Sequence, residues 1–135
     1  MVRGTRPPHR VYERLFAIGL QLPGTTRETR YDGSPVLRAN GVFVAGVASH
    51  CSAEPGSIVV RCALEDRECL LSEAPETYYV TDYHRPYPVV LARLEALDDE
   101  ALRDLLAVSW RLTMEKTGSR RVRQQRLQVD DTSYG

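Results

Sequence analysis

Apolar side chains recur at three- and four-residue spacing in two parts of the chain, which is the period of an amphipathic helix. In residues 11–22 the repeat follows Pro7-Pro8 and stops at Leu22-Pro23-Gly24, because proline restricts the residue before it and glycine accepts left-handed geometry. The second repeat predicts a helix from about Asp99 to Glu115, with Asp98 as its N-cap. The sequence therefore predicts a helix near each end of its patterned region.

Between these helices the pattern is that of strands. Thr26–Tyr31 is polar and is expected at a sheet edge, whereas Ile58–Cys62 is almost continuously apolar and is expected in the middle of the sheet. Pro35–Arg38 and Val42–Ala48 flank Asn40-Gly41, a strong hairpin signal because a type I′ turn needs positive φ at both central residues. These segments predict an antiparallel meander.

A short helix and two more strands complete the predicted order. Residues 64–73 suit a helix that ends before Pro75. Tyr78–Val80 and Val89–Leu91 suit strands on either side of the loop Thr81–Pro88. The expected fold is α+β, with one domain over residues 1–116 and a flexible basic arm over residues 117–135 that has no apolar period.

Composition agrees with one globular domain. The chain has 135 residues, of which 42% are hydrophobic and 27% are charged. It contains no apolar run long enough to cross a membrane, and residues 11–22 carry too many polar side chains for a secretory signal. We therefore expect a cytoplasmic protein with no membrane contact.

Charge is unevenly distributed although the net charge is zero. Residues 1–38 hold seven Arg against three acids, residues 39–109 hold five Arg against twelve acids, and residues 110–135 hold six Lys or Arg against three acids. Residues 116–126 contain five positive charges and no acid. Such a run suits phosphate contact through Coulomb attraction, and equally suits a solvated tail.

Residue types that carry catalysis or bind metal do not form a known motif. Cys51, Cys62 and Cys69 show no CxxC spacing, so we expect buried or half-buried reduced thiols, no metal and no cofactor. His50 and Cys51 are adjacent, and neighbouring residues of a strand face opposite ways, which argues against a nucleophile–base pair. We expect no enzyme activity.

The loop Thr81–Pro88 and its flanks form the most informative stretch, with four of the seven tyrosines between Tyr78 and Tyr87. Aromatic faces stack on unpaired bases, and arginine stacks or pairs with phosphate. We place Tyr83, His84 and Arg85 at the tip of this loop. The alternative is that the tyrosines pack on the edge of the core with wet hydroxyl groups.

The order of these parts resembles a known family. Leu20-Gln21-Leu22-Pro23-Gly24-Thr25-Thr26-Arg27-Glu28 resembles the ALxLPGxxE opening of the MmcQ/YjbR-like family. The resemblance covers roughly residues 11–115. Its later parts, in order, are Gly41-Val42-Phe43-Val44, Val59-Val60-Arg61, the helix around Glu65–Leu71, Tyr78-Tyr79-Val80, the aromatic loop, Asp98-Asp99-Glu100 and Trp110-Arg111.

The resemblance implies a two-layer α+β fold, similar to a CyaY-like or secretion-chaperone-like arrangement, with helices on an antiparallel sheet of about five to six strands. Members are often described as DNA-binding because of a proposed double-wing surface. Arg61 aligns with a basic position of the family and is expected to contact a ligand at the surface. One departure is Ala63-Leu64, where many relatives start the middle helix with Asp-Pro, a better N-cap.

Together these observations predict a non-catalytic binding module for nucleic acid, with DNA as the expected partner. The alternative is a protein-interaction or small-ligand domain. The expected nucleic-acid contacts are Arg61, Tyr83, His84, Arg85, Tyr87, Lys116, Arg120, Arg121 and Arg123.

Overall fold

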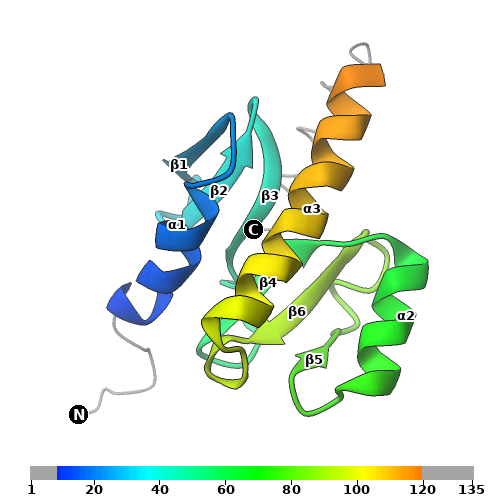
Figure 1. Ribbon diagram of the computed structural model, residues 1–135. Coiled ribbons are helices and arrows are strands. Elements are labelled where there is room, and N and C mark those ends of the chain that lie inside the picture. The colour runs from blue at the N-terminus through cyan, green and yellow to red at the C-terminus, as the bar shows by residue number, and fades with distance from the viewer. Residues whose placement is uncertain (1–8, 120–135) are drawn as a thin grey trace.

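The computed structural model describes residues 9–119 (Figure 1). Short 3₁₀ turns precede two of its three α-helices. In chain order the elements are η1 (His9–Tyr12), α1 (Glu13–Gly19), β1 (Thr25–Thr29), β2 (Pro35–Ala39), β3 (Val42–Val47), β4 (Ser57–Arg61), α2 (Leu64–Glu73), β5 (Tyr78–Tyr79), β6 (Val89–Arg93), η2 (Leu94–Ala96) and α3 (Asp99–Ser119).

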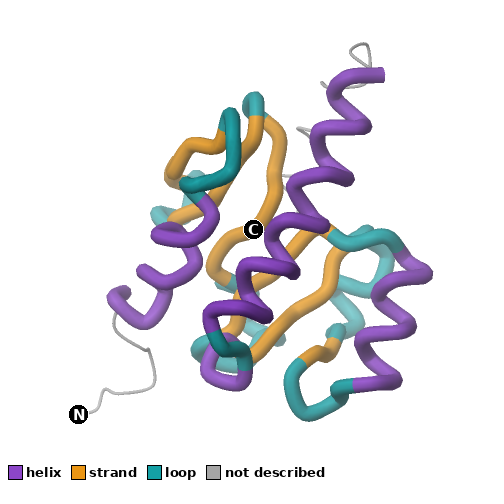
Figure 2. The backbone as a smooth tube through the Cα atoms, in the orientation of Figure 1, coloured by secondary structure: helices purple, strands orange, loops and turns teal. Residues whose placement is uncertain are grey.

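The strands form one six-stranded antiparallel sheet in the order β1-β2-β3-β4-β6-β5. Helices α1 and α3 lie across one face of this sheet, and α2 stands beside the edge formed by β6 and β5 (Figures 1 and 2). The predicted α+β fold with three helices on an antiparallel sheet is confirmed.

The turn between β2 and β3 has the predicted backbone geometry. Asn40 has φ of 52° and Gly41 has φ of 82°, the left-handed region that a type I′ turn requires at both positions. Ala39 pairs with Val42 on either side of this turn. The hairpin brings the apolar residues of β2 and β3 into register over the core.

The main core lies between the sheet and the helices α1 and α3. It contains Leu15 and Phe16 from α1, Leu102 and Leu106 from α3, and alternate residues of the strands, such as Ile58. A smaller apolar cluster, made of Val36, Phe43, Val59 and Val89, occupies the other face of the sheet. Both faces of β4 are therefore buried, as its continuous apolar sequence predicts.

Helix ends differ from the predictions in two places. Helix α1 ends at Gly19 rather than at Leu22, because the hydroxyl of Thr25 donates to the carbonyl oxygens of Gly19 and Leu22 and holds the chain in a turn. Helix α3 begins as predicted, with the Asp98 carboxylate accepting the amide of Ala101 at 2.8 Å. It continues to Ser119, so the predicted arm cannot begin at residue 117, and residues 120–135 lie outside the described part.

Helix α2 spans Leu64–Glu73, as predicted, although Ala63 provides no side-chain cap. The acids Glu65 and Asp66 in its first turn complement the helix dipole instead. No helix between residues 9 and 119 is long and apolar enough to cross a bilayer.

Candidate functional site

The loop Thr81–Pro88 packs against the loop between β3 and β4 through stacked rings. The rings of His50 and Tyr83 lie 3.6 Å apart at an interplanar angle of 11°. His84 meets both rings edge-on, at 5.9 Å from His50 and 5.0 Å from Tyr83, and Tyr87 lies 6.2 Å from Tyr83. We call His50, Tyr83, His84 and Tyr87 the aromatic cluster.

A chain of hydrogen bonds runs beside these rings. The Nδ1 atom of His50 lies 2.8 Å from the hydroxyl of Ser52, which donates to the hydroxyl of Thr81 at 3.0 Å. The hydroxyl of Thr81 in turn lies 2.7 Å from Nδ1 of His84. These contacts direct Nδ1 of the His50 ring toward Ser52, whereas the adjacent Cys51 is exposed.

His84 is fully buried, with 0% of its surface exposed. Burial, together with the smaller effects of the nearby His50 and Arg30, lowers the pKa of His84 to about 4. The ring is therefore neutral at pH 7, and its Nε2 atom is buried without a hydrogen-bond partner. The expectation that His84 projects from the loop tip is wrong.

The backbone of the loop explains why His84 points inward. The amides of His84 and Arg85 both donate to the carbonyl of Thr81, which coils this part of the loop into a turn. Asp82 and Arg85 then face solvent while His84 is buried. Sequence patterning does not reveal such a turn, because it contains neither a glycine nor an apolar repeat.

Arg61 is also buried, with 2% of its surface exposed, so the expectation of a surface contact is wrong. It lies at the end of β4, a strand covered on both faces. Its Nε atom donates to the carbonyl of Phe43 on the neighbouring strand at 2.9 Å. Arg61 contributes to the interior of the sheet, and its side chain has no surface from which to reach a phosphate.

Three of the predicted contacts remain accessible. Tyr83 and Tyr87 are half-buried, and the side chain of Arg85 is 57% exposed with its Nε 3.8 Å from the carboxylate of Asp82. Lys116 lies in α3, but its side chain is not among those described. Arg120, Arg121 and Arg123 lie outside residues 9–119.

A buried arginine that the sequence pattern did not indicate bonds to the backbone of the loop Thr81–Pro88. Arg67 of α2 is 6% exposed, and its guanidinium donates to the carbonyls of Arg85, Tyr87 and Val89 at 2.9–3.1 Å. No carboxylate of the described residues lies within ion-pair distance of it, so carbonyl dipoles accept from its two Nη atoms without cancelling its charge, while its Nε atom is buried without a hydrogen-bond partner. The one sequence feature that could have drawn attention to Arg67 is its position among acids, in the run Glu65-Asp66-Arg67-Glu68.

Two arginines of the basic N-terminal third, Arg27 and Arg38, do not lie at this loop, whereas Arg30 is buried near His84. Arg27 pairs with Glu13 at 3.1 Å and lies over the ring of Phe16. Arg38 pairs with Glu28 at 2.7 Å. Both arginines belong to β1 and β2, at the edge of the sheet opposite β5. An arginine that is already paired with a carboxylate attracts a phosphate less strongly.

No group of three or more metal-ligating side chains occurs within residues 9–119. The three cysteines are free thiols. Cys62 is buried, as expected, whereas Cys51 and Cys69 are exposed, so the predicted burial is wrong for these two.

Fold and site together define a small α+β domain in which an aromatic loop covers part of the sheet face opposite α1 and α3. The comparison with protein families is specific: the model of the YjbR family matches residues 20–112. The chain belongs to the YjbR family. Neither a curated protein nor a solved structure matches it.

Proposed function

We propose that this domain is a binding module for nucleic acid and that the loop Thr81–Pro88 makes the contact. The main support is the buried guanidinium of Arg67 beneath that loop, bonded to carbonyls and to no carboxylate of the described residues. Arg85 adds an exposed cation on the same loop, against the single acid Asp82. A positive potential in a partly desolvated position attracts phosphate.

The rings of the aromatic cluster support the second half of the proposal, contact with bases. Tyr83 and Tyr87 are half-buried, and the stack with His50 holds the Tyr83 ring in one orientation. Ring–base stacking contributes about 1–3 kcal/mol per base and needs unpaired bases. The proposal therefore favours single-stranded over duplex nucleic acid. It also agrees with the DNA-binding role that the family resemblance implies.

The contact set is revised to Tyr83, Arg85 and Tyr87, with Lys116, Arg120, Arg121 and Arg123 kept as predicted contacts of the basic C-terminal segment. Arg61 and His84 are withdrawn because neither has exposed surface. No catalytic step is proposed, and a cytoplasmic location stays a prediction from the sequence.

The test is a fluorescence-anisotropy titration with a labelled single-stranded oligonucleotide and its duplex at several salt concentrations. Arg85→Ala is expected to weaken binding and to reduce the salt slope by about 0.7 for the single strand, the value for one lost phosphate contact. Replacing Arg120, Arg121 and Arg123 together with Gln is expected to reduce the slope further.

Arg103→Ala is the matched control, because Arg103 is an exposed arginine on α3, away from the loop. If Arg103→Ala weakens binding as much as Arg85→Ala, the attraction is bulk charge and the loop has no special part in it. Absence of binding at low salt would reject the nucleic-acid function.

Protein or small-ligand binding is the second candidate function. It is favoured by a separate feature, an apolar groove between α2 and α3.

A further inference from the structure

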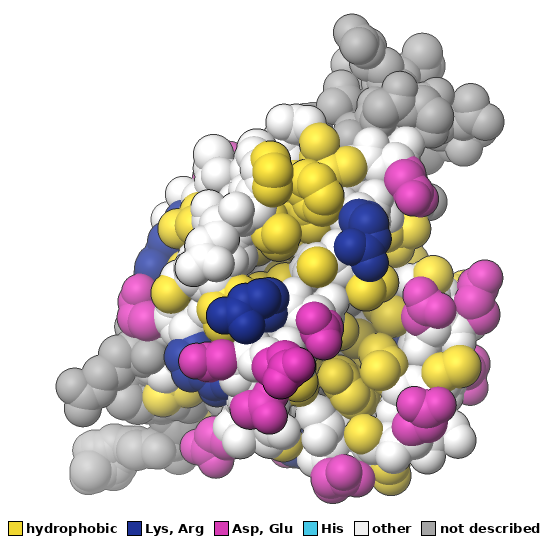
Figure 3. Space-filling view, in the orientation of Figure 1, with side chains coloured by type: hydrophobic (Ala, Val, Ile, Leu, Met, Phe, Trp, Pro, Cys, Tyr) yellow, Lys and Arg dark blue, Asp and Glu magenta, His cyan; other side chains and the backbone are white. Residues whose placement is uncertain are grey.

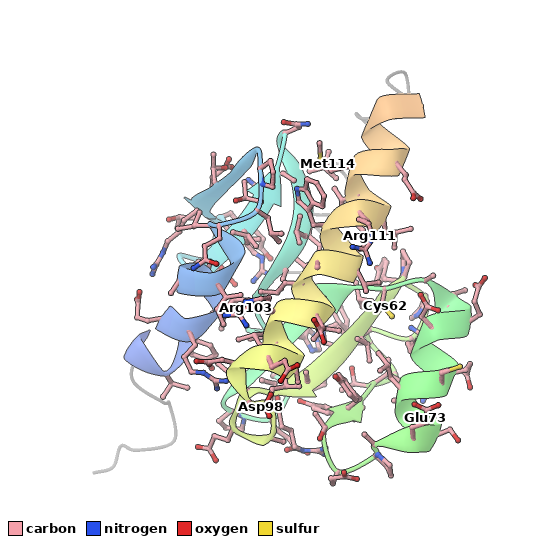
Figure 4. The ribbon with its side chains drawn as sticks, in the orientation of Figure 1. Cys62, Glu73, Asp98, Arg103, Arg111 and Met114 are labelled. Atoms are coloured by element: carbon pink, nitrogen blue, oxygen red, sulfur yellow. The ribbon has the colours of Figure 1, made fainter. Side chains whose placement is uncertain are left out.

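A groove with a volume of about 450 Å³ lies between α2 and α3, with β5 at its base. Its apolar walls are formed by Leu70 of α2, Tyr78 of β5, and Leu105 and Val108 of α3. Figure 3 shows hydrophobic side chains lying open between the two helices. Figure 4 labels Cys62 at one end of the groove and Glu73 on α2 toward the other.

Helix α2 is weakly supported on its apolar side. Its one buried residue is Arg67, while Leu64 is 52% exposed and Leu70 and Leu71 are half-buried. Within residues 9–119 no hydrogen bond or ion pair joins a side chain of α2 to α3. Val108, on the facing wall, is 43% exposed. Both walls thus present apolar surface that the described chain leaves open.

The charges around the groove are mainly negative. Asp66 lines it from α2 and Asp104 lines it from α3. Arg61 also lines it, but it is 2% exposed and its Nε atom donates to the carbonyl of Phe43. Arg103 lies on the side of α3 that faces α1, and Arg111 is an exposed cation on α3 near the Cys62 end of the groove (Figure 4). The helices that form the groove carry further exposed acids, Glu65, Glu68 and Glu73 on α2 and Glu100 on α3, and Asp98 directly precedes α3.

We propose that this groove binds an amphipathic helix of a partner protein that carries Lys or Arg beside its apolar face. The groove positions Ala101 to Val108 extend over two turns of α3, about 10 Å, which matches apolar side chains at i, i+3, i+4 and i+7 of a facing helix. The carboxylates of Asp66 and Asp104 on opposite walls select positive flanks and repel nucleic acid. Tyr83 and Arg85 take no part, so this inference is independent of the nucleic-acid proposal.

The probe is a labelled synthetic peptide with Leu at helical i, i+3, i+4 and i+7 positions and Lys beside them. A second peptide carries Glu in place of every Lys. We expect the full chain to bind the Lys peptide at least about tenfold more tightly than the Glu peptide, and the difference to shrink with added salt.

Two substitutions locate the binding. Val108→Glu places a charge on the apolar wall and is expected to weaken binding of the Lys peptide about tenfold. The matched control is Leu20→Glu, because Leu20 is 45% exposed and lies outside the groove. Asp104→Lys is expected to weaken binding of the Lys peptide and to strengthen binding of the Glu peptide. This exchange of preference cannot arise from partial unfolding.

The proposal is overturned if Val108→Glu and Leu20→Glu bind the Lys peptide equally, or if Asp104→Lys leaves the charge preference unchanged. It is also overturned if neither peptide binds while an apolar dye occupies the groove, since the site would then suit a small ligand. Loss of oligonucleotide binding has no bearing on this result.

Discussion

The imidazole ring of His50 lies flat on the phenol ring of Tyr83, with ring centroids 3.6 Å apart. The first residue follows β3 and the second follows β5, so the stack connects two loops that are distant in the sequence. Together with the Ser52–Thr81 hydrogen bond, it holds the loop Thr81–Pro88 in place. Several measurable consequences depend on this arrangement.

The first prediction concerns the stack itself. In a double-mutant cycle, His50→Ala and Tyr83→Ala should show a coupling free energy of about 0.5–1.5 kcal/mol in urea unfolding, because each ring loses its partner in either single variant. Tyr31→Ala is the control, since Tyr31 is 81% exposed, and should change stability by less than about 0.5 kcal/mol. Additive single effects would contradict the stacked geometry.

The second prediction is a pH dependence of stability caused by His84. Its pKa is about 4 in the folded chain and 6.5 when unperturbed, so between these values the unfolded chain binds a proton that the folded chain does not. Stability should therefore fall as the pH falls from 6.5 to 4, by at most about 3 kcal/mol. Urea unfolding at several pH values measures this slope.

The contribution of His84 can be separated from that of the carboxylates. In His84→Gln the slope between pH 6.5 and 4 should flatten, because the titrating ring is gone. In the unmodified chain the NMR signals of this ring should titrate near pH 4. A midpoint close to 6.5 would show that the ring is exposed to water.

The third prediction concerns Arg67, which connects α2 to the loop. Arg67→Met should lower the free energy of unfolding by about 3 kcal/mol, because three carbonyls lose a charged donor. Amide exchange in residues 85–89 should become faster. Arg103→Met makes the same change at an exposed position of α3 and should alter the free energy of unfolding by less than about 0.5 kcal/mol. Equal effects of the two variants would refute the anchoring role.

The fourth prediction concerns thiol reactivity. Burial, together with the nearby Asp66 carboxylate, raises the pKa of the Cys62 thiol to about 11. At pH 8 only about one thiol in a thousand would be the reactive thiolate, and the side chain is also shielded. Mass spectrometry after iodoacetamide treatment should find label on the exposed Cys51 and Cys69, and on Cys62 only after unfolding. Rapid labelling of Cys62 in the folded chain would contradict this.

Much of the fold followed from local sequence signals. Asn40-Gly41 predicted its turn because few residue pairs accept positive φ at both positions, and the backbone has this geometry. The apolar run Ile58–Cys62 predicted a strand in the middle of the sheet, and β4 is central and buried on both faces. Both features depend on adjacent residues and on the spacing of apolar side chains, which can be read directly from a sequence.

The candidate site was harder to predict because its geometry depends on distant contacts. His84 is buried and its ring meets the ring of His50, which no local pattern connects to it. Arg61 was expected at the surface because it aligns with a basic position of the family, but the second face of the sheet is covered. Arg67 was overlooked because its partners are carbonyl oxygens of a separate loop, and backbone acceptors leave no trace in side-chain composition.

The two borders of the sheet have a consequence for self-assembly. On one border, β1 presents Thr26, Arg27 and Thr29 to solvent, and on the other, β5 is only two residues long. Charged side chains and very short strands hinder the addition of a strand from a second molecule. Concentrated samples of this protein should therefore resist amyloid-like, edge-to-edge aggregation, even though the interior of the sheet is strongly apolar.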